Sequence, residues 1–306
     1  LGMPRREVVA MKRFVAASVQ FSVKPMDAEE NMKIAKDWVY RCHESSHANL
    51  IVLPESVTTG FSPAGGVGAL WDVIDTIPGK FTDEATRWAR ELDTYIVFPT
   101  YERGGEDGVV YNSAALIGPD GVMGVYRKTH PFPSERLEGG GWTTPGKEPC
   151  CVETPLGKIG IIICYDGDFP ELSRATALMG AEVICRPSAF LRTFDQWELT
   201  NKARAYDNHV YVIATNSVGF DASGAQYFGG SMIVHPSGMK LAQARCSDEF
   251  IWATLDPNPI STITPNSSSP QYFDHIEDRN LEAYKGILQR GKCAFEPAKR
   301  IPYSWK

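Results

Sequence analysis

The sequence predicts an α/β protein in which two mixed β-sheets pack face to face, with helices on the outside. Short apolar runs alternate with helical segments as far as Leu255, which is typical of helices packed on sheets. Two hairpin signals, Pro119-Asp120-Gly121 and Pro236-Ser237-Gly238, interrupt the alternation, so the sheets should be mixed. The order strand, helix, strand and hairpin occurs in both halves of the chain, and this repetition predicts two similar sheets.

In the first half, each apolar run is bounded by helix or turn signals. Residues 27–46 should form a helix, because apolar residues recur at helical spacing from Met32 to Val39 behind an acidic first turn. Residues 82–92 should form the next helix. The strands expected in this half cover residues 14–21, 49–54, 95–99, 111–117 and 122–126.

In the second half, the run KIGIIIC at residues 158–164 is too apolar for a strand with a solvated face. Helices are expected at 170–179, where Gly180 supplies the stop, and at 197–208. The remaining expected strands cover residues 182–186, 210–215, 231–235, 240–244 and 250–255. From about residue 257 the composition changes to Pro, Ser, Thr and Asn and then to a charged, aromatic stretch. We expect a single domain over 1–306 with an extended C-terminal tail from about 257.

Composition excludes several classes of protein. Hydrophobic residues make up 43% and charged residues 22% of the chain, an ordinary globular balance that excludes a largely disordered protein. The net charge of −6 argues against a nucleic-acid partner, and the lack of a run of about 18 apolar residues argues against a membrane span. Seven scattered cysteines argue against a disulfide framework and favour a reducing, cytoplasmic location. Because no CxxC, HExxH or HxH spacing occurs, no metal site is expected.

Three polar residues follow apolar strands directly. Glu55 comes after Ile-Val-Leu-Pro, Lys128 after Val-Tyr-Arg, and Cys164 after a run of isoleucines. α/β folds place their functional sites at the carboxyl ends of strands. If the three meet there, the carboxylate could take the thiol proton, and the ammonium could stabilise a thiolate or an oxyanion.

With these three residues and their neighbours, the chain resembles the nitrilase, or carbon–nitrogen hydrolase, superfamily. Leu53-Pro54-Glu55 is similar to its first signature, residues 126–130 (YRKTH) to its second, and residues 164–171 (CYDGDFPE) to its third. The three occur in order, and the resemblance extends from about Phe14 to Leu255. It implies a four-layer α-β-β-α sandwich of two mixed sheets, no metal or organic cofactor, and hydrolysis of a non-peptide C–N bond through a thioester.

The resemblance also implies roles for individual residues. Cys164 would be the nucleophile and Glu55 the general base, while Lys128 and the backbone N–H of Tyr165 would form the oxyanion hole. A second glutamate usually follows the lysine in this superfamily. Glu135 is the preferred candidate and Glu138 its competitor, because the glycine run at 139–141 blurs the family spacing.

The residues expected to contact substrate are Asp168, Arg186 and Trp142. Related amidases commonly carry arginine four residues after the cysteine, where this chain has Asp168. An acidic side chain facing the pocket would repel a substrate carboxylate. Arg186 could instead form an ion pair with Asp168 and neutralise it. Trp142, after the glycine run, is a candidate for the pocket wall.

The leading hypothesis is an amidase-like enzyme that releases ammonia and a carboxylic acid from a small or medium carboxamide. The sequence Tyr165-Asp166 after the cysteine favours amides over nitriles, since nitrilases usually have Trp-Glu there. An amidohydrolase of N-carbamoyl compounds is the alternative, and a nitrilase or a non-catalytic scaffold is a weaker one. The resemblance further implies a homodimer or larger homo-oligomer, with contacts expected at 169–179 and 272–306.

Overall fold

The computed structural model describes residues 11–257, 274–289 and 292. The chain divides into two units, Leu1–Ile260 and Ser261–Lys306, and each is described by itself. In the second unit the described elements are the 3-10 turn η4 (Leu281–Tyr284) and the short helix α6 (Lys285–Leu288). Most of the junction near the expected start of the tail, residues 258–273, lies outside the described residues. The expected extent of a single domain therefore stays a prediction.

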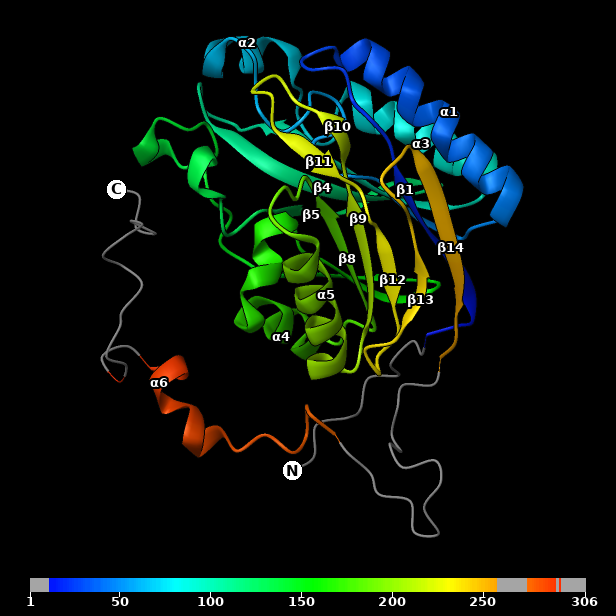
Figure 1. Ribbon diagram of the computed structural model, residues 1–306, viewed down its shortest axis with the longest axis vertical. Coiled ribbons are helices and arrows are strands. Elements are labelled where there is room, and N and C mark those ends of the chain that lie inside the picture. The colour runs from blue at the N-terminus through cyan, green and yellow to red at the C-terminus, as the bar shows by residue number, and fades with distance from the viewer. Residues whose placement is uncertain (1–10, 258–273, 290–291, 293–306) are drawn as a thin grey trace. The chain divides into compact units, whose positions relative to one another are not determined.

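The first unit contains two six-stranded sheets of matching topology (Figure 1). The first has the order β14-β1-β2-β3-β4-β5 and the second the order β13-β12-β9-β8-β7-β6. The strands of the first sheet are β1 (Phe14–Gln20), β2 (Leu50–Val52), β3 (Tyr95–Arg103), β4 (Val110–Gly118), β5 (Gly121–Arg127) and β14 (Glu249–Leu255). Those of the second are β6 (Cys150–Thr154), β7 (Gly157–Ile161), β8 (Val183–Ser188), β9 (Tyr211–Asn216), β12 (Met232–Val234) and β13 (Lys240–Gln243).

Each sheet has three parallel strands at its centre and antiparallel strands at its edges. In the first sheet β1, β2 and β3 are parallel, and in the second β7, β8 and β9 are parallel. The hairpins β4–β5 and β12–β13 are antiparallel, as the two Pro-Gly turn signals predicted. The prediction of two similar mixed sheets is confirmed.

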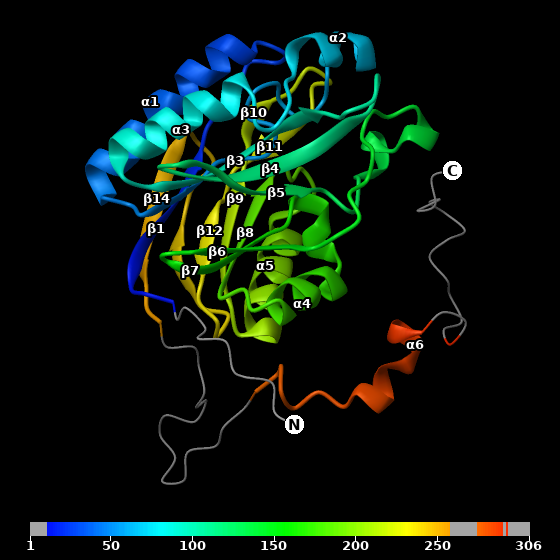
Figure 2. The same cartoon turned by 180° about the vertical axis from the view of Figure 1, so that it is seen from behind.

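Helices cover the outer faces of both sheets (Figure 2). Helices α1 (Ala28–Ser46) and α3 (Lys80–Leu92) pack on the first sheet, whereas α4 (Pro170–Leu178) and α5 (Phe194–Asn208) pack on the second. Between the sheets, the hydroxyls of Ser18 in β1 and Thr215 in β9 are 2.7 Å apart. The α-β-β-α sandwich is thus confirmed.

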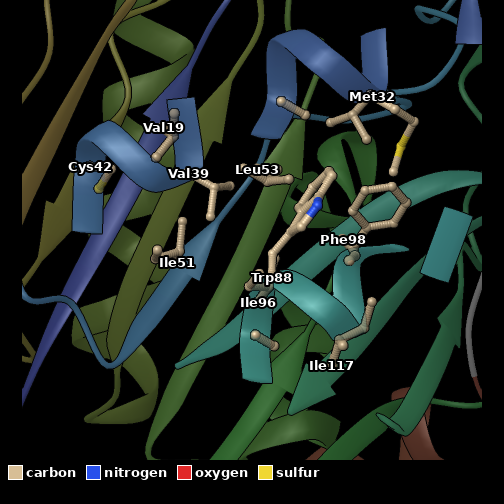
Figure 3. Packing of buried hydrophobic residues seen from close by; sticks show 14 of the residues in the cluster. Val19, Met32, Val39, Cys42, Ile51, Leu53, Trp88, Ile96, Phe98 and Ile117 are labelled. Atoms are coloured by element: carbon tan, nitrogen blue, oxygen red, sulfur yellow. The ribbon is translucent and has the colours of Figure 1, made fainter. Parts of the chain in front are cut away.

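An apolar core lies between the first sheet and its two helices (Figure 3). Val39 from α1 and Trp88 from α3 pack toward Ile51 and Leu53, and all four are at most 1% exposed. Burial of each such aliphatic side chain contributes about 1.5–3 kcal/mol, so this core stabilises the packing of the two helices on the first sheet.

The predicted helices and strands are all present, with some differences in their bounds, but several short elements were missed. The run predicted as a strand at 158–164 ends at Ile161, and Cys164 begins the 3-10 turn η3 (Cys164–Asp168) instead. In the first unit the other missed elements are α2 (Gly66–Val73), β6, the hairpin β10 (Val218–Phe220) and β11 (Gln226–Phe228), and the 3-10 turns η1 (Pro133–Glu135) and η2 (Leu137–Gly139). Most contain five residues or fewer, too few to establish a periodic pattern.

Candidate active site

Two buried glutamates share one buried lysine. Glu55 lies three residues beyond β2, Lys128 directly follows β5, and Glu135 is the last residue of η1. Lys128 Nζ donates to Glu55 Oε1 at 2.8 Å and to Glu135 Oε2 at 2.5 Å. None of the three side chains is exposed to solvent. Glu138, the competitor of Glu135, is exposed on η2.

Asn112 of β4 completes this group, and the sequence analysis missed it. Its Nδ2 donates to Glu55 Oε1 at 2.7 Å and to Glu135 Oε1 at 2.9 Å. The other oxygen of Glu55, Oε2, accepts from the backbone N–H of Ala189 at 2.7 Å. Asn112 and its neighbour Ser113 are polar residues at buried positions of the mostly apolar strand β4, a signal that could have pointed to Asn112.

Burial and the neighbouring charges decide the protonation of this group. Burial alone would lower the pKa of Lys128, but the carboxylates of Glu135 and Glu55 outweigh it and raise the pKa above its ordinary value. Lys128 therefore remains an ammonium. Burial raises the pKa of Glu135, and the charge of Lys128 offsets only part of that rise. Glu135 is consequently a carboxyl that holds a proton more readily than a solvated glutamate does.

Cys164 lies at the turn between β7 and α4. Its φ of 46° is in the left-handed region, which a residue with a side chain adopts only at a cost in strain. Burial raises the pKa of the Cys164 thiol, as does the charge of Glu55, while Lys128 and Arg186 act in the opposite direction. The thiol is therefore protonated at rest and within electrostatic reach of both Glu55 and Lys128.

Asp166 joins the cysteine turn to the segment that follows Lys128. Its Oδ2 accepts from Ile163 N at 2.9 Å and from Tyr126 Oη at 2.7 Å. Its Oδ1 accepts from His130 N at 2.9 Å, and His130 Nδ1 lies at the same distance. The fully buried Asp166 carboxylate thus fixes the distance between the two loops that carry the thiol and the ammonium.

A narrow, largely aromatic pocket opens beside the thiol. Its lining consists of Phe61, Phe132, Cys164, Tyr165, Ala189, Phe190, Leu191 and Arg192. The ring of Tyr165 packs edge-on against Phe132, with ring centroids 5.4 Å apart. In the part of the chain that the structure describes, no hydrogen bond is made by the backbone N–H of Tyr165.

The three residues expected to bind substrate are placed differently from one another. Asp168 accepts from Arg192 Nη2 at 2.6 Å and lies 3.6 Å from Arg186 Nη2, so its charge is compensated. Arg186 is completely buried and bonds to the carbonyl of Cys164. Trp142 packs in a cluster with Leu70. Among the ring contacts of the described residues, its one contact with the pocket lining is with Phe61.

Within residues 11–257, 274–289 and 292, no group of three or more His, Cys, Asp or Glu side chains could hold a metal ion. In the same residues, none of the helices has both the length and the apolar character needed to cross a membrane.

Comparisons with known proteins identify the family of the chain. At the level of sequence, the chain is 30% identical to a probable nitrilase of Schizosaccharomyces pombe, over 89% of this chain and 97% of that protein. It is also 30% identical to an omega-amidase of Xenopus tropicalis (83% and 92%) and 31% identical to a formamidase of Bacillus cereus (84% and 78%). The solved structure of Nit3 from Saccharomyces cerevisiae, described as a nitrilase superfamily member, superposes with a TM-score of 0.73 at 26% identity, covering 82% of this chain and 93% of that one. The family model for carbon-nitrogen hydrolases matches residues 15–263, and the chain therefore belongs to the carbon–nitrogen hydrolase family.

Proposed function

We propose that this protein hydrolyses a non-peptide carboxamide through a thioester on Cys164 and releases ammonia and a carboxylic acid. The observation that carries the proposal is the hydrogen bonding of Lys128 to both Glu55 and Glu135, all buried, beside a thiol on a strained turn. The relatives named as amidases support the same class of reaction.

In the first half of the reaction, Glu55 takes the thiol proton while the sulfur attacks the amide carbon. Because burial raises the pKa of the Cys164 thiol, this transfer should accompany the attack rather than precede it. The carbonyl oxygen becomes an oxyanion, which Lys128 Nζ and the Tyr165 N–H stabilise. Glu55 then returns the proton to the nitrogen, the C–N bond breaks, and ammonia leaves.

In the second half, Glu55 takes a proton from water, and the resulting hydroxide attacks the thioester carbon. Collapse of this second tetrahedral intermediate breaks the C–S bond, and the sulfur regains a proton. Glu135 would hold Lys128 in place, because its Oε2 accepts from Nζ at 2.5 Å and from the Phe132 N–H at 2.8 Å.

The pocket supports a small, uncharged carboxamide as substrate. Most of its lining is aromatic or aliphatic. Arg192, the charged residue of that lining, is paired with Asp168 at 2.6 Å, so neither side chain offers an uncompensated charge to the substrate. An N-carbamoyl compound remains the alternative that the same mechanism could serve.

Ammonia release from a set of substrates tests the proposal. The set holds aliphatic and aromatic amides, amino-acid amides, N-carbamoyl amino acids, carbamoyl amines and nitriles, with wild type and Cys164→Ala assayed together. We expect release from small amides that is abolished in the variant. Release from carbamoyl compounds alone would overturn the choice of substrate, whereas release that persists in Cys164→Ala would overturn the mechanism.

We also propose a homodimer or larger assembly in a reducing, cytoplasmic compartment. Support for the assembly comes from the end of α4, where Leu178 and Met179 are 46% and 47% exposed. Of the second expected contact region, 272–306, only 274–289 and 292 belong to the described residues. The free thiols among the described residues support the compartment. A monomer at micromolar concentration in solution scattering would contradict the assembly.

A further inference from the structure

A completely buried guanidinium lies behind the proposed nucleophile. Arg186 of β8 donates to the carbonyl oxygen of Cys164 twice, from Nε at 2.8 Å and from Nη2 at 2.6 Å. Its Nη1 donates to Thr200 Oγ1 at 2.9 Å and to Asn201 Oδ1 at 2.7 Å on α5. The carboxylate of Asp168 is farther away, at 3.6 Å. The cation thus directs its two bonds on this side to a peptide group rather than to a carboxylate.

The Arg186 guanidinium is charged although it is buried, and Gly167 leaves the space that it occupies. Burial lowers the pKa of Arg186 to about 10, although the charges of Cys164 and Asp168 act against the shift, so the guanidinium is still protonated at neutral pH. A buried charge of this kind is costly. Gly167 makes room for it, because a Cβ at that position would lie 2.0 Å from Arg186 Cζ.

The carbonyl of Cys164 and the N–H of Tyr165 belong to the same peptide bond. A charged donor at the carbonyl oxygen draws electron density from the amide nitrogen, which makes the N–H a stronger donor. We propose that Arg186 is a positioning residue that acts through this peptide bond and strengthens the Tyr165 N–H toward the oxyanion of the substrate. The inference rests on the proposed function, since it requires Cys164 as nucleophile and Tyr165 as donor.

This role should affect the transition state more than substrate binding. The oxyanion exists only after attack, so a weaker N–H lowers kcat and leaves KM nearly unchanged. Arg186 also acts on the thiol directly, because its charge lowers the pKa of Cys164 against the larger effect of burial. The experiment must therefore separate stabilisation of the thiolate from stabilisation of the oxyanion.

Two reactions of the same sulfur provide that separation. Amide turnover forms an oxyanion, whereas alkylation of Cys164 by iodoacetamide needs the thiolate but forms none. For Arg186→Met and Arg186→Lys, we expect kcat to fall about 10- to 100-fold, a part of the 10²–10³-fold cost of losing a donor altogether. KM and the alkylation rate should change less than about fivefold. An equal fall in kcat and alkylation, or an unchanged kcat, would overturn the inference.

Arg204 supplies a matched control. It is also mostly buried, and its Nε donates at 3.0 Å to the carbonyl of Gly167, three residues after the Cys164 carbonyl in the same turn. Arg204→Lys therefore removes a comparable buried bond from the same turn. Its kcat should stay close to that of wild type, and a loss as large as in Arg186→Lys would mean that any disturbance of the turn has this effect.

Chemical rescue provides a readout that a merely structural role would not move. In Arg186→Gly, guanidinium chloride at millimolar concentration should raise kcat at least about fivefold, whereas urea, which has a similar shape but no charge, should not. Equal effects of both additives would contradict the role of charge.

If these variants do not fold, Asn201→Asp keeps Arg186 and offers its Nη1 a carboxylate. Its kcat should then fall at least threefold more than its alkylation rate, and equal falls would overturn the inference.

Failure of the inference can be told apart from failure of the proposed function. A wild-type protein that releases no ammonia from any substrate overturns the function. An active wild type whose Arg186 variants keep their kcat overturns only the inference about Arg186.

Discussion

Asn112 and Lys128 donate to the same two carboxylates. Asn112 Nδ2 lies 2.7 Å from Glu55 and 2.9 Å from Glu135, and Lys128 Nζ lies 2.8 Å and 2.5 Å from the same pair. One cation thus compensates two buried carboxyls. The Asn112 amide adds one hydrogen bond to each of them, beside those from the backbone N–H groups of Ala189 and Phe132. Without the amide, the charges of the site would not be balanced by hydrogen bonds.

Asn112→Asp should disable the site even though the shapes of the two side chains are nearly identical. The substitution replaces the shared donor with an acceptor and adds a third carboxyl beside one lysine. We expect kcat to fall at least tenfold and the free energy of unfolding at pH 7 to fall by about 2–4 kcal/mol. Ammonia release and urea unfolding measure the two. The control is Asn49→Asp, whose Oδ1 accepts from Val15 N at 3.0 Å and would still be an acceptor. A comparable loss in both variants would contradict this explanation.

Glu135 and Glu138 should differ sharply in their importance to activity. Glu135 is buried and accepts from Lys128, Asn112 and the Phe132 N–H, whereas Glu138 is exposed. In Glu135→Gln, an NH2 group replaces one of the two acceptor oxygens, so it faces at least one of these donors without a hydrogen bond. We therefore expect kcat/KM to fall about 100-fold. Glu138→Gln should stay within twofold of wild type. Steady-state kinetics of both variants checks this, and similar values for the two would contradict the assignment of Glu135.

Sequence pattern predicted the strands that precede Glu55 and Lys128, but not the 3-10 turns η3 and η1 that carry Cys164 and Glu135. Glu55, Lys128 and Cys164 could be identified because each directly follows an apolar run and matches a local motif. Asn112 could not be identified in this way, since its partners Glu55 and Glu135 lie 57 and 23 residues away along the chain. Such contacts depend on sheet pairing and loop paths, which no local spacing encodes.

The contacts of Arg186, a long side chain, could not be predicted from local sequence spacing either. The sequence suggested contact with substrate or an ion pair with Asp168. The ion pair is present at 3.6 Å, but the sequence did not predict the two hydrogen bonds from the guanidinium to the Cys164 carbonyl. This placement depends on Gly167, which leaves the space, and on Thr200 and Asn201, which fix the far side of the guanidinium. Gly167 belongs to η3, whereas Thr200 and Asn201 belong to α5, so their convergence on Arg186 is a property of the packed fold.

Asp166→Asn should loosen the connection between the cysteine turn and the segment after Lys128. The two oxygens of Asp166 accept from the Ile163 N–H, the Tyr126 hydroxyl and the His130 N–H. In Asp166→Asn only one acceptor oxygen remains, so not all of these hydrogen bonds can form. We expect the free energy of unfolding to fall by about 1.5–3 kcal/mol and kcat to fall with it. Urea unfolding of this variant beside Asp195→Asn, an exposed aspartate on α5, gives the comparison. Unchanged stability in Asp166→Asn would show that this connection between the two segments is dispensable.

Buried thiols should make the protein less stable at alkaline pH. Burial raises the pKa of Cys42 to about 12, against a partial opposing effect of the Ser46 hydroxyl, and raises that of Cys150 to about 11. A thiol in the unfolded chain titrates near 8.5. Above that pH the unfolded state has lost protons that the folded state still holds, so the free energy of unfolding falls as pH rises. The stabilisation is complete below about pH 8.5 and is lost progressively toward pH 11–12.

Cys42→Ala tests this pH dependence directly. Cys42 is completely buried in the core of the first sheet, and each titrating thiol contributes a slope of at most about 1.4 kcal/mol per pH unit. Urea unfolding under reducing conditions at pH 8, 9 and 10 should give a steep decline in wild type and a shallower one in Cys42→Ala, even though the variant starts from a lower stability. Cys246→Ala, which removes an exposed thiol, should keep the wild-type slope. Parallel slopes in wild type and Cys42→Ala would mean that groups other than this thiol govern alkaline unfolding.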